Sequence, residues 1–390
     1  MMKVYHITSS GGGMHSRMIK EIHTLQKIDC VDEIKIIVWN RNKLNKNILE
    51  ISKEKKVKLN IINIPSQYGK ITLSIVKFWF SLFRKIRKEA DENTLLWVHG
   101  LISAIPITLL KLSGKKFKFI YDIHDLDFEI IYQNYKNIFG KFLSKFFEKI
   151  DLFLVRQVDR ILVPTESIGK NCNGLKEFYI NKGIKEEKIV TLWNVPEIDK
   201  FLNYKKIKLK KPKGFVVGYI GLIREEVYKS ILILFETINE LGQDYKIVLV
   251  GFGTAKEKLK KIAKKKYKNL NIIFYDAVKY NILPNYYNIC DAILSIMYGE
   301  IKNVKRAIQT KVFESAFLGI PVIVQENTLN ADFVRKYNCG VVIKDLTVEE
   351  IKIALEKVKK IKFNPEDIRK KWNWKNEEKK LVKIIKELNK

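Results

Sequence analysis

The sequence has few of the residues that would place it in several large classes of protein. Its 390 residues include only 4 cysteines and 8 prolines. The cysteines are scattered without Cys-x-x-Cys spacing: Cys30, Cys172, Cys290 and Cys339. This excludes a disulfide or zinc framework and predicts reduced thiols. No apolar run approaches the roughly 20 residues that span a bilayer, and segment 1–13 lacks the features of a signal peptide. We therefore expect a cytoplasmic protein.

Acidic residues are also few compared with basic residues. There are 43 Asp and Glu residues against 73 Lys and Arg residues, so the formal net charge is +30. Such a positive field attracts polyanions, whether nucleic acid, an anionic membrane surface or a phosphate-bearing substrate. A sequence rich in Lys, Ile and Asn also arises from an AT-rich genome. The charge alone leaves these interpretations open.

Apolar residues make up 46% of the chain, and its length suggests two domains with cores of their own. Short apolar runs alternate with helical segments, and the expected strands are 2–8, 33–39, 57–65, 95–100, 116–125, 160–165, 188–196, 214–221, 245–253, 271–278, 291–297, 321–326 and 340–345. This alternation predicts parallel sheets covered by helices on both faces. The expected fold class is α/β, with two doubly wound Rossmann-like domains facing each other across a ligand-binding cleft. The basic segment 205–213, which contains a proline, is the predicted linker.

The histidines all lie in the first half of the chain: His6, His15, His23, His99 and His124. His124 ends an expected strand in the sequence YDIHDLD, at the position where doubly wound folds bind ligands. His6 and His23 are interpreted as structural. Asp122, Asp125 and Asp127 suggest a metal cluster around His124, but their spacing matches no zinc-binding helix motif, and we expect no metal there.

Glycines end the first two strands of the second half. Gly221 is followed by Arg224 and Lys229, and the next strand ends in Gly251 and Gly253. Without side chains at such turns, backbone N–H groups can approach a phosphate. This pattern predicts an anion site.

A third feature of the second half is the segment KRAIQTKVFESAFLGIPVIV (305–324). Glu314 lies in a helical stretch that leads into a strand, where its carboxylate is suited to accept hydrogen bonds from sugar hydroxyls. Thr310, Lys311 and nearby loop N–H groups are suited to phosphate. The segment predicts a site for a phosphorylated sugar.

In their order and spacing these motifs resemble the retaining GT-B glycosyltransferases of glycosyltransferase family 4 (glycosyl transferases group 1). The resemblance covers essentially the whole chain. Its supports are SSGGG (9–13), YDIHD (121–125), VGYIG (217–221), IVLVGFG (247–253), ILPNYYNICDAILSI (282–296), KVFESAFLGIPVIV (311–324), IRKKWNW (368–374) and LVKIIKEL (381–388). It implies a first domain over 1–204 on the acceptor side, a nucleotide-sugar-binding domain over 205–370, and a C-terminal helix over 371–390 that returns to the first domain.

The resemblance also implies roles for single residues. His124 matches the active-site histidine near the transferred sugar, and Lys229 with Arg224 matches the basic pair that neutralises the leaving diphosphate. Glu314 matches the glutamate that holds the donor ribose. The expected catalytic residues are His124, Arg224 and Lys229, and the expected donor-binding residues are Gly12, Gly13, Gly253, Val278, Arg306, Thr310, Lys311 and Glu314.

Two positions depart from the usual family pattern. Arg306 stands where the first glutamate of the Glu-x7-Glu motif is common, and Leu222 stands where an arginine is usual. Some branches of the family replace that first glutamate by another pattern, which Asn303, Ala307, Lys311 and Glu314 fit. Gln309 stands where this pattern has a proline. These departures affect the expected activity more than the expected fold.

The resemblance implies transfer of a sugar from a nucleotide-diphosphate sugar to an acceptor hydroxyl with retention, in glycan, polysaccharide or glycolipid assembly. No metal or other cofactor is expected. One alternative is a non-catalytic GT-B protein that binds another enzyme. The other is a nucleic-acid-binding protein, but no zinc-finger or RRM signature is present and nucleic acid is not an expected partner.

Segments 70–88 and 141–157 mix bulky apolar residues with lysine and arginine. Helices of this kind lie in the interface of an anionic bilayer. The alternative is that both helices simply cover the first sheet. We expect a glycan or lipid-linked acceptor and peripheral contact with the inner face of the cell membrane, with Trp79 and Phe83 as apolar anchors if they are exposed.

Overall fold

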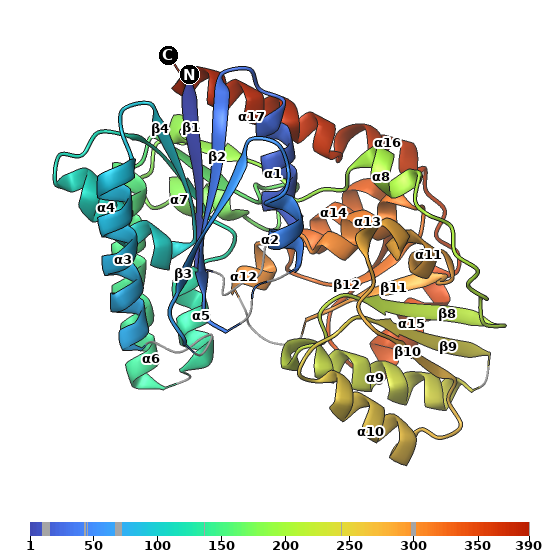
Figure 1. The fold of residues 1–390 in the computed structure, drawn as a ribbon. Coiled ribbons are helices and arrows are strands. Elements are labelled where there is room, and N and C mark those ends of the chain that lie inside the picture. Colours follow the sequence, from blue (N-terminus) through green and yellow to red (C-terminus); the bar gives the residue numbers. More distant parts are fainter. Residues whose placement is uncertain are drawn as a thin grey trace. The chain divides into compact units, whose positions relative to one another are not determined.

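The computed structural model describes residues 1–9, 16–42, 44, 46–66, 72–135, 137–242, 244–297 and 302–389. The predicted donor-binding residues Gly12 and Gly13 lie outside these ranges. Two compact units divide the chain (Figure 1). The first unit comprises Met1–Glu166, Leu175–Asn194 and Glu377–Lys390, and the second comprises Ser167–Gly174 and Val195–Asn376.

The chain enters the main part of the second unit at Val195. Segment 205–213, the predicted linker, is therefore part of that unit. Its backbone is held by Asn285, whose side-chain amide donates to Lys205 O (2.9 Å) and accepts from Ile207 N–H (3.1 Å). These hydrogen bonds tie the polar, basic segment to α11 (Leu283–Asn288) of the second unit.

The first unit is built on a seven-stranded sheet in the order β3-β2-β1-β4-β5-β6-β7. All neighbouring strands pair in parallel, as the sequence predicts. The strands are β1 (Met2–Thr8), β2 (Val31–Asn40), β3 (Val57–Asn63), β4 (Thr94–His99), β5 (Lys118–Asp122), β6 (Arg160–Val163) and β7 (Ile189–Thr191).

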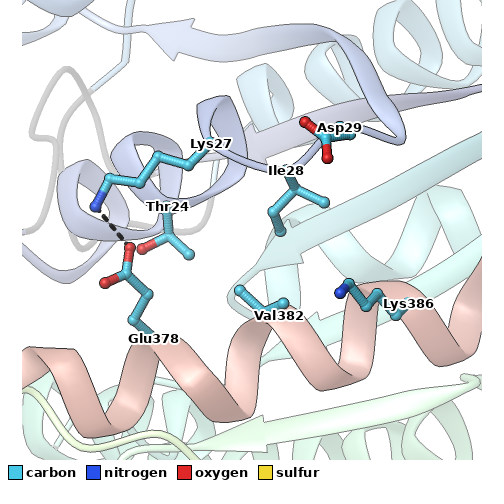
Figure 2. Close-up of a pocket in the computed structure, with 7 residues that line it drawn as sticks. All are labelled: Thr24, Lys27, Ile28, Asp29, Glu378, Val382 and Lys386. Atoms are coloured by element: carbon cyan, nitrogen blue, oxygen red, sulfur yellow. Dashed lines mark hydrogen bonds and ion pairs between the residues drawn. The ribbon is translucent and has the colours of Figure 1, made fainter.

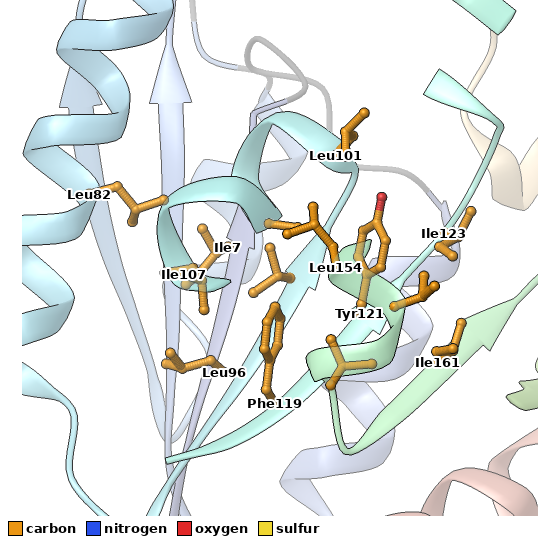
Figure 3. Close-up of a cluster of buried hydrophobic side chains, with 14 of the residues drawn as sticks. Ile7, Leu82, Leu96, Leu101, Ile107, Phe119, Tyr121, Ile123, Leu154 and Ile161 are labelled. Carbon is orange, nitrogen blue, oxygen red and sulfur yellow. The ribbon is translucent and has the colours of Figure 1, made fainter. Parts of the chain in front are cut away.

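Helices connect these strands, as parallel pairing requires. They are α1 (Ser16–Gln26), α2 (Lys46–Ile51), α3 (Leu73–Glu89), α4 (Leu101–Leu112), α5 (Asp127–Asn134), α6 (Ile138–Gln157), α7 (Leu175–Ile180) and the 3-10 helix η1 (Glu186–Lys188). Helices α3, α4 and α6 place their inner side chains in one apolar cluster with the sheet. Figure 3 shows this core, in which Leu82, Ile107 and Leu154 of the helices gather near Leu96, Phe119 and Tyr121 of the strands.

The C-terminal helix α17 (Trp374–Leu388) returns to the first unit from Glu377 onward. Its buried residues follow a helical spacing along one face: Leu381, Ile384, Ile385 and Leu388. Glu378 accepts a hydrogen bond from Lys27 of α1 (2.7 Å), and a pocket of about 350 Å³ lies between the two helices (Figure 2). The expectation of a helix that packs back on the first domain is confirmed.

The second unit has a six-stranded parallel sheet in the order β10-β9-β8-β11-β12-β13. Its strands are β8 (Phe215–Ile220), β9 (Tyr245–Val250), β10 (Ile272–Tyr275), β11 (Ala292–Ser295), β12 (Val322–Gln325) and β13 (Gly340–Ile343). Its helices are α8 (Ile198–Leu202), α9 (Glu225–Leu241), α10 (Lys256–Lys266), η2 (Tyr280–Ile282), α11 (Leu283–Asn288), α12 (Lys302–Lys305), α13 (Thr310–Phe317), α14 (Leu329–Tyr337), α15 (Val348–Val358) and α16 (Pro365–Lys371). Both sheets reverse their strand order beside the first strand, which is the topology that creates a ligand site at the carboxyl ends.

Within the described part of the chain, no helix combines the length and the apolar character that a membrane crossing requires.

Candidate active site

The carboxyl end of β5 positions His124, the histidine that the sequence predicts to be catalytic. His124 lies in the connection between β5 and α5, and about a fifth of its side chain is exposed. Asp127, at the start of α5, accepts a hydrogen bond from Leu101 N–H (2.6 Å) at the start of α4. This contact anchors the connection that carries His124, and it gives Asp127 a structural task instead of a place in a metal cluster.

A buried ion pair lies behind His124. Asp122, fully buried at the end of β5, pairs with the Arg17 guanidinium of α1 and accepts a hydrogen bond from Trp97 Nε1 (3.1 Å). Arg17 also donates to Glu21 Oε1 (3.0 Å) and to Leu192 O (3.1 Å). Burial, together with the charge of Asp122, raises the pKa of Glu21 well above its usual range. The Arg17 guanidinium therefore lies between two buried carboxyl groups, those of Asp122 and Glu21.

Three histidines form a row next to this ion pair. His6 Nδ1 lies 2.9 Å from His99 Nε2, and His99 Nδ1 lies 3.0 Å from His124 Nε2. The rings of His6 and His99 are stacked, with centroids 5.3 Å apart. Burial lowers the pKa of His6 to about 3 and that of His99 well below its usual range. Both buried rings are therefore neutral at physiological pH.

The sequence analysis did not assign His6, His99, Arg17 or Glu21 to the site. The strand order explains the omission, because β1, β4 and β5 are neighbours in the sheet although they are far apart in the chain. In register, His99 pairs with Thr8 on one side and with Asp122 on the other. One feature of the sequence could have pointed to His99: two successive expected strands, 95–100 and 116–125, both end near a histidine.

Metal ligation was tested against these side chains. Among the described residues, two triads have ligand atoms within 4.8 Å of one another: His6, Glu21, His99 and His99, Asp122, His124. The Arg17 guanidinium already pairs with Asp122 and donates to Glu21. Its positive charge would repel a metal ion at either triad. The imidazole nitrogens already face one another in hydrogen bonds. We interpret both triads as parts of one hydrogen-bonded network.

In the second unit the glycine turns bring two loops together. A Cβ at Gly251 would lie 1.9 Å from Gly221 O, and one at Gly253 would lie 2.2 Å from Ile223 O. The N–H of Gly251 donates to Tyr275 O (3.2 Å), and that of Gly221 donates to Val250 O (2.9 Å). These two N–H groups, which the sequence analysis offered to a phosphate, hold the loops instead.

Buried Lys256, at the start of α10, fixes the same edge of the sheet. Its ammonium donates to Gly251 O (2.8 Å), Tyr275 O (2.8 Å) and Asp276 Oδ1 (2.6 Å). One cation thus joins the carboxyl ends of β9 and β10. It gives the glycine loops a rigid base.

Lys311 and Glu314, one turn apart on α13, form the polar centre of the second unit's site. Lys311 Nζ lies 3.8 Å from the ring centroid of Tyr219 in β8, and Glu314 Oε2 accepts a hydrogen bond from the Tyr287 hydroxyl (2.6 Å). Burial lowers the pKa of Lys311 to about 7, against the opposing influence of Glu314. A Cβ at Gly221 would lie 3.5 Å from Lys311 Nζ, so this lysine adjoins the first glycine turn.

The other predicted residues of this unit lie on separate elements. Arg224 caps the start of α9, and Lys229 is on that helix, both exposed. Val278 follows β10, half-buried. Arg306 follows α12, and Thr310 is the first residue of α13. The structure therefore places Lys311 beside Gly221 and joins Glu314 to α11, while the basic pair lies on α9.

Residues 200–380 match the family model described as glycosyl transferases group 1. The matched region is similar to the members of that family. It includes β8 to β13 and every predicted second-unit site residue. No curated protein sequence matches the chain.

Solved structures show that the group 1 region is part of a larger fold. A lipopolysaccharide outer core galactosyltransferase, WaaB, is 16% identical with a TM-score of 0.64, and the match covers 97% of each chain. Alr3699/HepE of Anabaena, in complex with UDP and glucose, is 13% identical with a TM-score of 0.68 over 99% of this chain and 100% of that one. Sucrose-phosphate synthase of Thermosynechococcus elongatus is 11% identical with a TM-score of 0.71 over 100% and 99%. The chain has the GT-B fold, as expected.

Proposed function

We propose that this protein is a retaining glycosyltransferase of the family 4 type, which transfers a sugar from a nucleotide-diphosphate sugar to an acceptor hydroxyl. The observation that carries the proposal is the placement of Lys311 and Glu314 one turn apart on α13, within the region that matches the group 1 model. It provides a cation for phosphate and a carboxylate for hydroxyl groups on one turn of helix. Similar folds have been solved with UDP and glucose and with UDP-glucose, which supports a nucleotide-sugar donor.

The chemistry requires stabilisation of negative charge on the departing diphosphate. Arg224, Lys229 and Lys311 are the cations that we assign to this task, because preorganised charges act most strongly where charge develops in the transition state. Val278, Arg306 and Thr310 complete the proposed donor site. We assign His124 to the transferred sugar, as the family resemblance implies.

We propose that no metal ion takes part, because side-chain cations can do the work that a divalent ion does on a diphosphate. Turnover should be unchanged by EDTA. Loss of activity on chelation, restored by Mg²⁺ or Mn²⁺, would contradict this part of the proposal.

Glu314→Gln should abolish donor-induced stabilisation. A panel of UDP-, GDP-, ADP- and dTDP-sugars in a thermal-shift experiment identifies the donor first, since ligand at 100 times Kd adds about 2.7 kcal/mol of apparent stability. The matched control is Tyr287→Phe, which removes the same 2.6 Å hydrogen bond and keeps the carboxylate. Equal donor binding by Glu314→Gln and wild type would remove Glu314 from the site.

Donor affinity should weaken as pH rises above neutrality. With a pKa of about 7, Lys311 loses its proton above that pH unless a bound diphosphate holds it, so binding takes up a proton. The affinity for UDP should fall by up to about tenfold per pH unit above 7. Calorimetry in buffers of different ionisation enthalpy measures the proton uptake. Lys311→Arg, whose charge is permanent, should bind without it. A flat pH profile in the wild type would contradict the assignment.

The alternative, a non-catalytic GT-B protein, is favoured by Arg306 and Leu222 at positions where the family usually has other residues. Product formation with the identified donor and a matched acceptor separates the two functions. Donor binding with no hydrolysis and no transfer would favour the alternative.

We also propose that the first unit docks on an anionic membrane, where a glycan or lipid-linked acceptor lies. Helices α3, α4 and α6 lie on one face of its sheet (Figure 1). Large apolar side chains of these helices are exposed. We call them the apolar surface: Leu73, Val76 and Phe80 of α3, Leu109 and Leu112 of α4, and Ile138, Phe139, Phe142, Phe146 and Phe153 of α6. Phe80 is 62% exposed and Phe142 is 66% exposed.

Cations accompany this apolar surface. Lys77 and Arg84 of α3 and Lys141, Lys145 and Lys149 of α6 are exposed. Each Lys or Arg near an anionic leaflet contributes about 1 kcal/mol of attraction, which salt screens. Phenylalanines on the outside of a basic helix favour a lipid surface as the partner.

The expected anchors Trp79 and Phe83 are not the exposed ones. The Trp79 indole donates to Ile102 O (2.7 Å), and both side chains pack against the core. The helical phase of α3 turns them inward because Phe78 and Leu82 are buried. Phe80 and the α6 phenylalanines replace them as proposed anchors.

The membrane proposal is tested by co-sedimentation with vesicles of increasing phosphatidylglycerol content. Wild type should bind at low ionic strength and be released by salt, whereas a variant with Phe139, Phe142 and Phe146 changed to serine should not bind. Phe252→Ser is the matched control, because this phenylalanine of the second unit is also 62% exposed. Wild-type binding that is indifferent to lipid charge would contradict the proposal.

A further inference from the structure

The histidine row connects the core of the first unit to its surface. His6 is fully buried in β1, His99 is 4% exposed at the end of β4, and His124 is the outermost ring. Each contact in the row joins two ring nitrogens, at 2.9 and 3.0 Å. Because a neutral imidazole has one donor nitrogen and one acceptor nitrogen, the direction of one hydrogen bond fixes the direction of the next.

Asp122 sets that direction. Its Oδ2 lies 3.4 Å from His99 Nδ1, closer than its Oδ1 lies to His124 Nε2 (3.9 Å). Its two oxygens are already acceptors for Arg17 and Trp97. An ionised carboxylate has no hydrogen to donate. A lone pair on His99 Nδ1 would therefore face a negative charge, whereas an N–H there is attracted to it. His99 must carry its hydrogen on Nδ1.

The inner end of the row agrees with this assignment. With Nδ1 protonated, His99 Nε2 is an acceptor, and His6 donates to it from Nδ1–H. His6 Nε2 then carries a lone pair and no hydrogen, and it is buried without a hydrogen-bond partner among the described residues. In the reverse assignment that atom would be a buried, unpaired N–H, which is the rarer and costlier defect.

We infer that Asp122 and His99 are positioning residues that hold His124 in the neutral tautomer with its hydrogen on Nδ1. His124 Nε2 accepts from His99 Nδ1–H, so His124 carries its own hydrogen on Nδ1. A histidine held in this way donates a hydrogen bond and is not set up to remove a proton. The identification of its acceptor as the transferred sugar rests on the proposed function, whereas the tautomer does not.

Asp122→Asn should reverse the direction of the hydrogen bonds along the histidine row. The amide oxygen can face Arg17 while the amide NH₂ takes the place of Oδ2 and donates to His99 Nδ1, at the cost of the hydrogen bond from Trp97 Nε1. An Asp-to-Asn exchange beside a histidine selects the other tautomer. The charge of Asp122 is one cause of the raised pKa of Glu21, so this pKa should fall in the variant, and Glu21 Oε1 already lies 3.0 Å from Arg17 Nε. The variant should therefore fold with His124 carrying its hydrogen on Nε2.

The test is long-range ¹H–¹⁵N NMR of the full chain labelled with ¹⁵N-histidine, at neutral pH and without donor. Wild type should show a pyrrole-type Nδ1 and a pyridine-type Nε2 for His124, and Asp122→Asn should exchange them. His6→Phe, which keeps the ring stack but lies at the far end of the row, should leave the His124 tautomer unchanged. A wild-type Nε2–H tautomer or imidazolium at His124, an unchanged tautomer in Asp122→Asn, or a response to His6→Phe would each overturn the inference.

Two further measurements distinguish this inference from a metal site and from the proposed function. One equivalent of Zn²⁺ should leave the His99 and His124 signals in place, and zinc-induced shifts of both rings would overturn the hydrogen-bonded row in favour of a metal site. Once a donor is identified, Asp122→Asn should lower kcat by about 10²-fold, the effect of losing one transition-state donor, with little change in donor affinity. Unchanged kcat with a reversed tautomer would overturn the role of the Nδ1–H group in turnover. Failure of every donor to bind would overturn the proposed function and leave the tautomer standing.

Discussion

Replacing Arg17 by methionine should lower the free energy of unfolding of the protein by about 3–5 kcal/mol, the usual effect of removing one partner of a buried ion pair. The guanidinium is 1% exposed and contacts Asp122, Glu21 and Leu192 O together. Methionine fills a similar volume but leaves Asp122 as an unpaired buried charge.

Urea unfolding of both proteins at neutral pH measures the difference. Arg87→Met, at an exposed position of α3, is the control and should change stability by less than about 0.5 kcal/mol. An Arg17→Met variant as stable as this control would show that the ion pair contributes nothing.

Lys229→Ala should lower kcat by about 10²–10³-fold, the typical loss when one preorganised donor to a developing anion is removed. The side chain is exposed on α9, so its removal should leave the fold intact. Arg224→Ala, at the start of the same helix, should have a similar effect. Steady-state kinetics with the identified donor and acceptor give the numbers.

Binding of a nucleoside that has no phosphates is the internal control for these two variants. It should be unchanged, since neither cation is assigned to the base or the ribose. Lys264→Ala, an exposed lysine on α10 of the same unit, controls for a general loss of positive charge. Equal loss of nucleoside binding and turnover would indicate damage to the second unit instead of a role in catalysis.

The sequence predicts elements that depend on local pattern. The helix expected over 101–112 is observed as α4 with the same bounds, and the expected strand 2–8 is β1. Parallel pairing follows from the alternation of apolar strands with helices, and both sheets confirm it. These features are readable because period and length are properties of contiguous residues.

Features that depend on strand order or helical phase were not predictable in the same way. His6, His99 and Asp122 meet because β1, β4 and β5 are neighbours, which no local pattern states. Trp79 and Phe80 are adjacent in the sequence, yet one packs on the core and the other faces solvent. The loop contacts of Gly251 likewise depend on a strand of distant sequence.

The return of α17 has a consequence for biosynthesis. The first unit is assembled from segments that flank almost the whole second unit, and its Lys27–Glu378 contact joins residues 351 positions apart. The ribosome therefore releases the sheet of the first unit before it has synthesised α17, which packs beside α1. Until then the core residues that Leu381 and Ile385 cover are exposed to solvent. Exposed hydrophobic core residues of this kind are bound by chaperones. Early folding of the second unit would hold its two ends at a fixed separation, which shortens the flexible loop that the last helix must close.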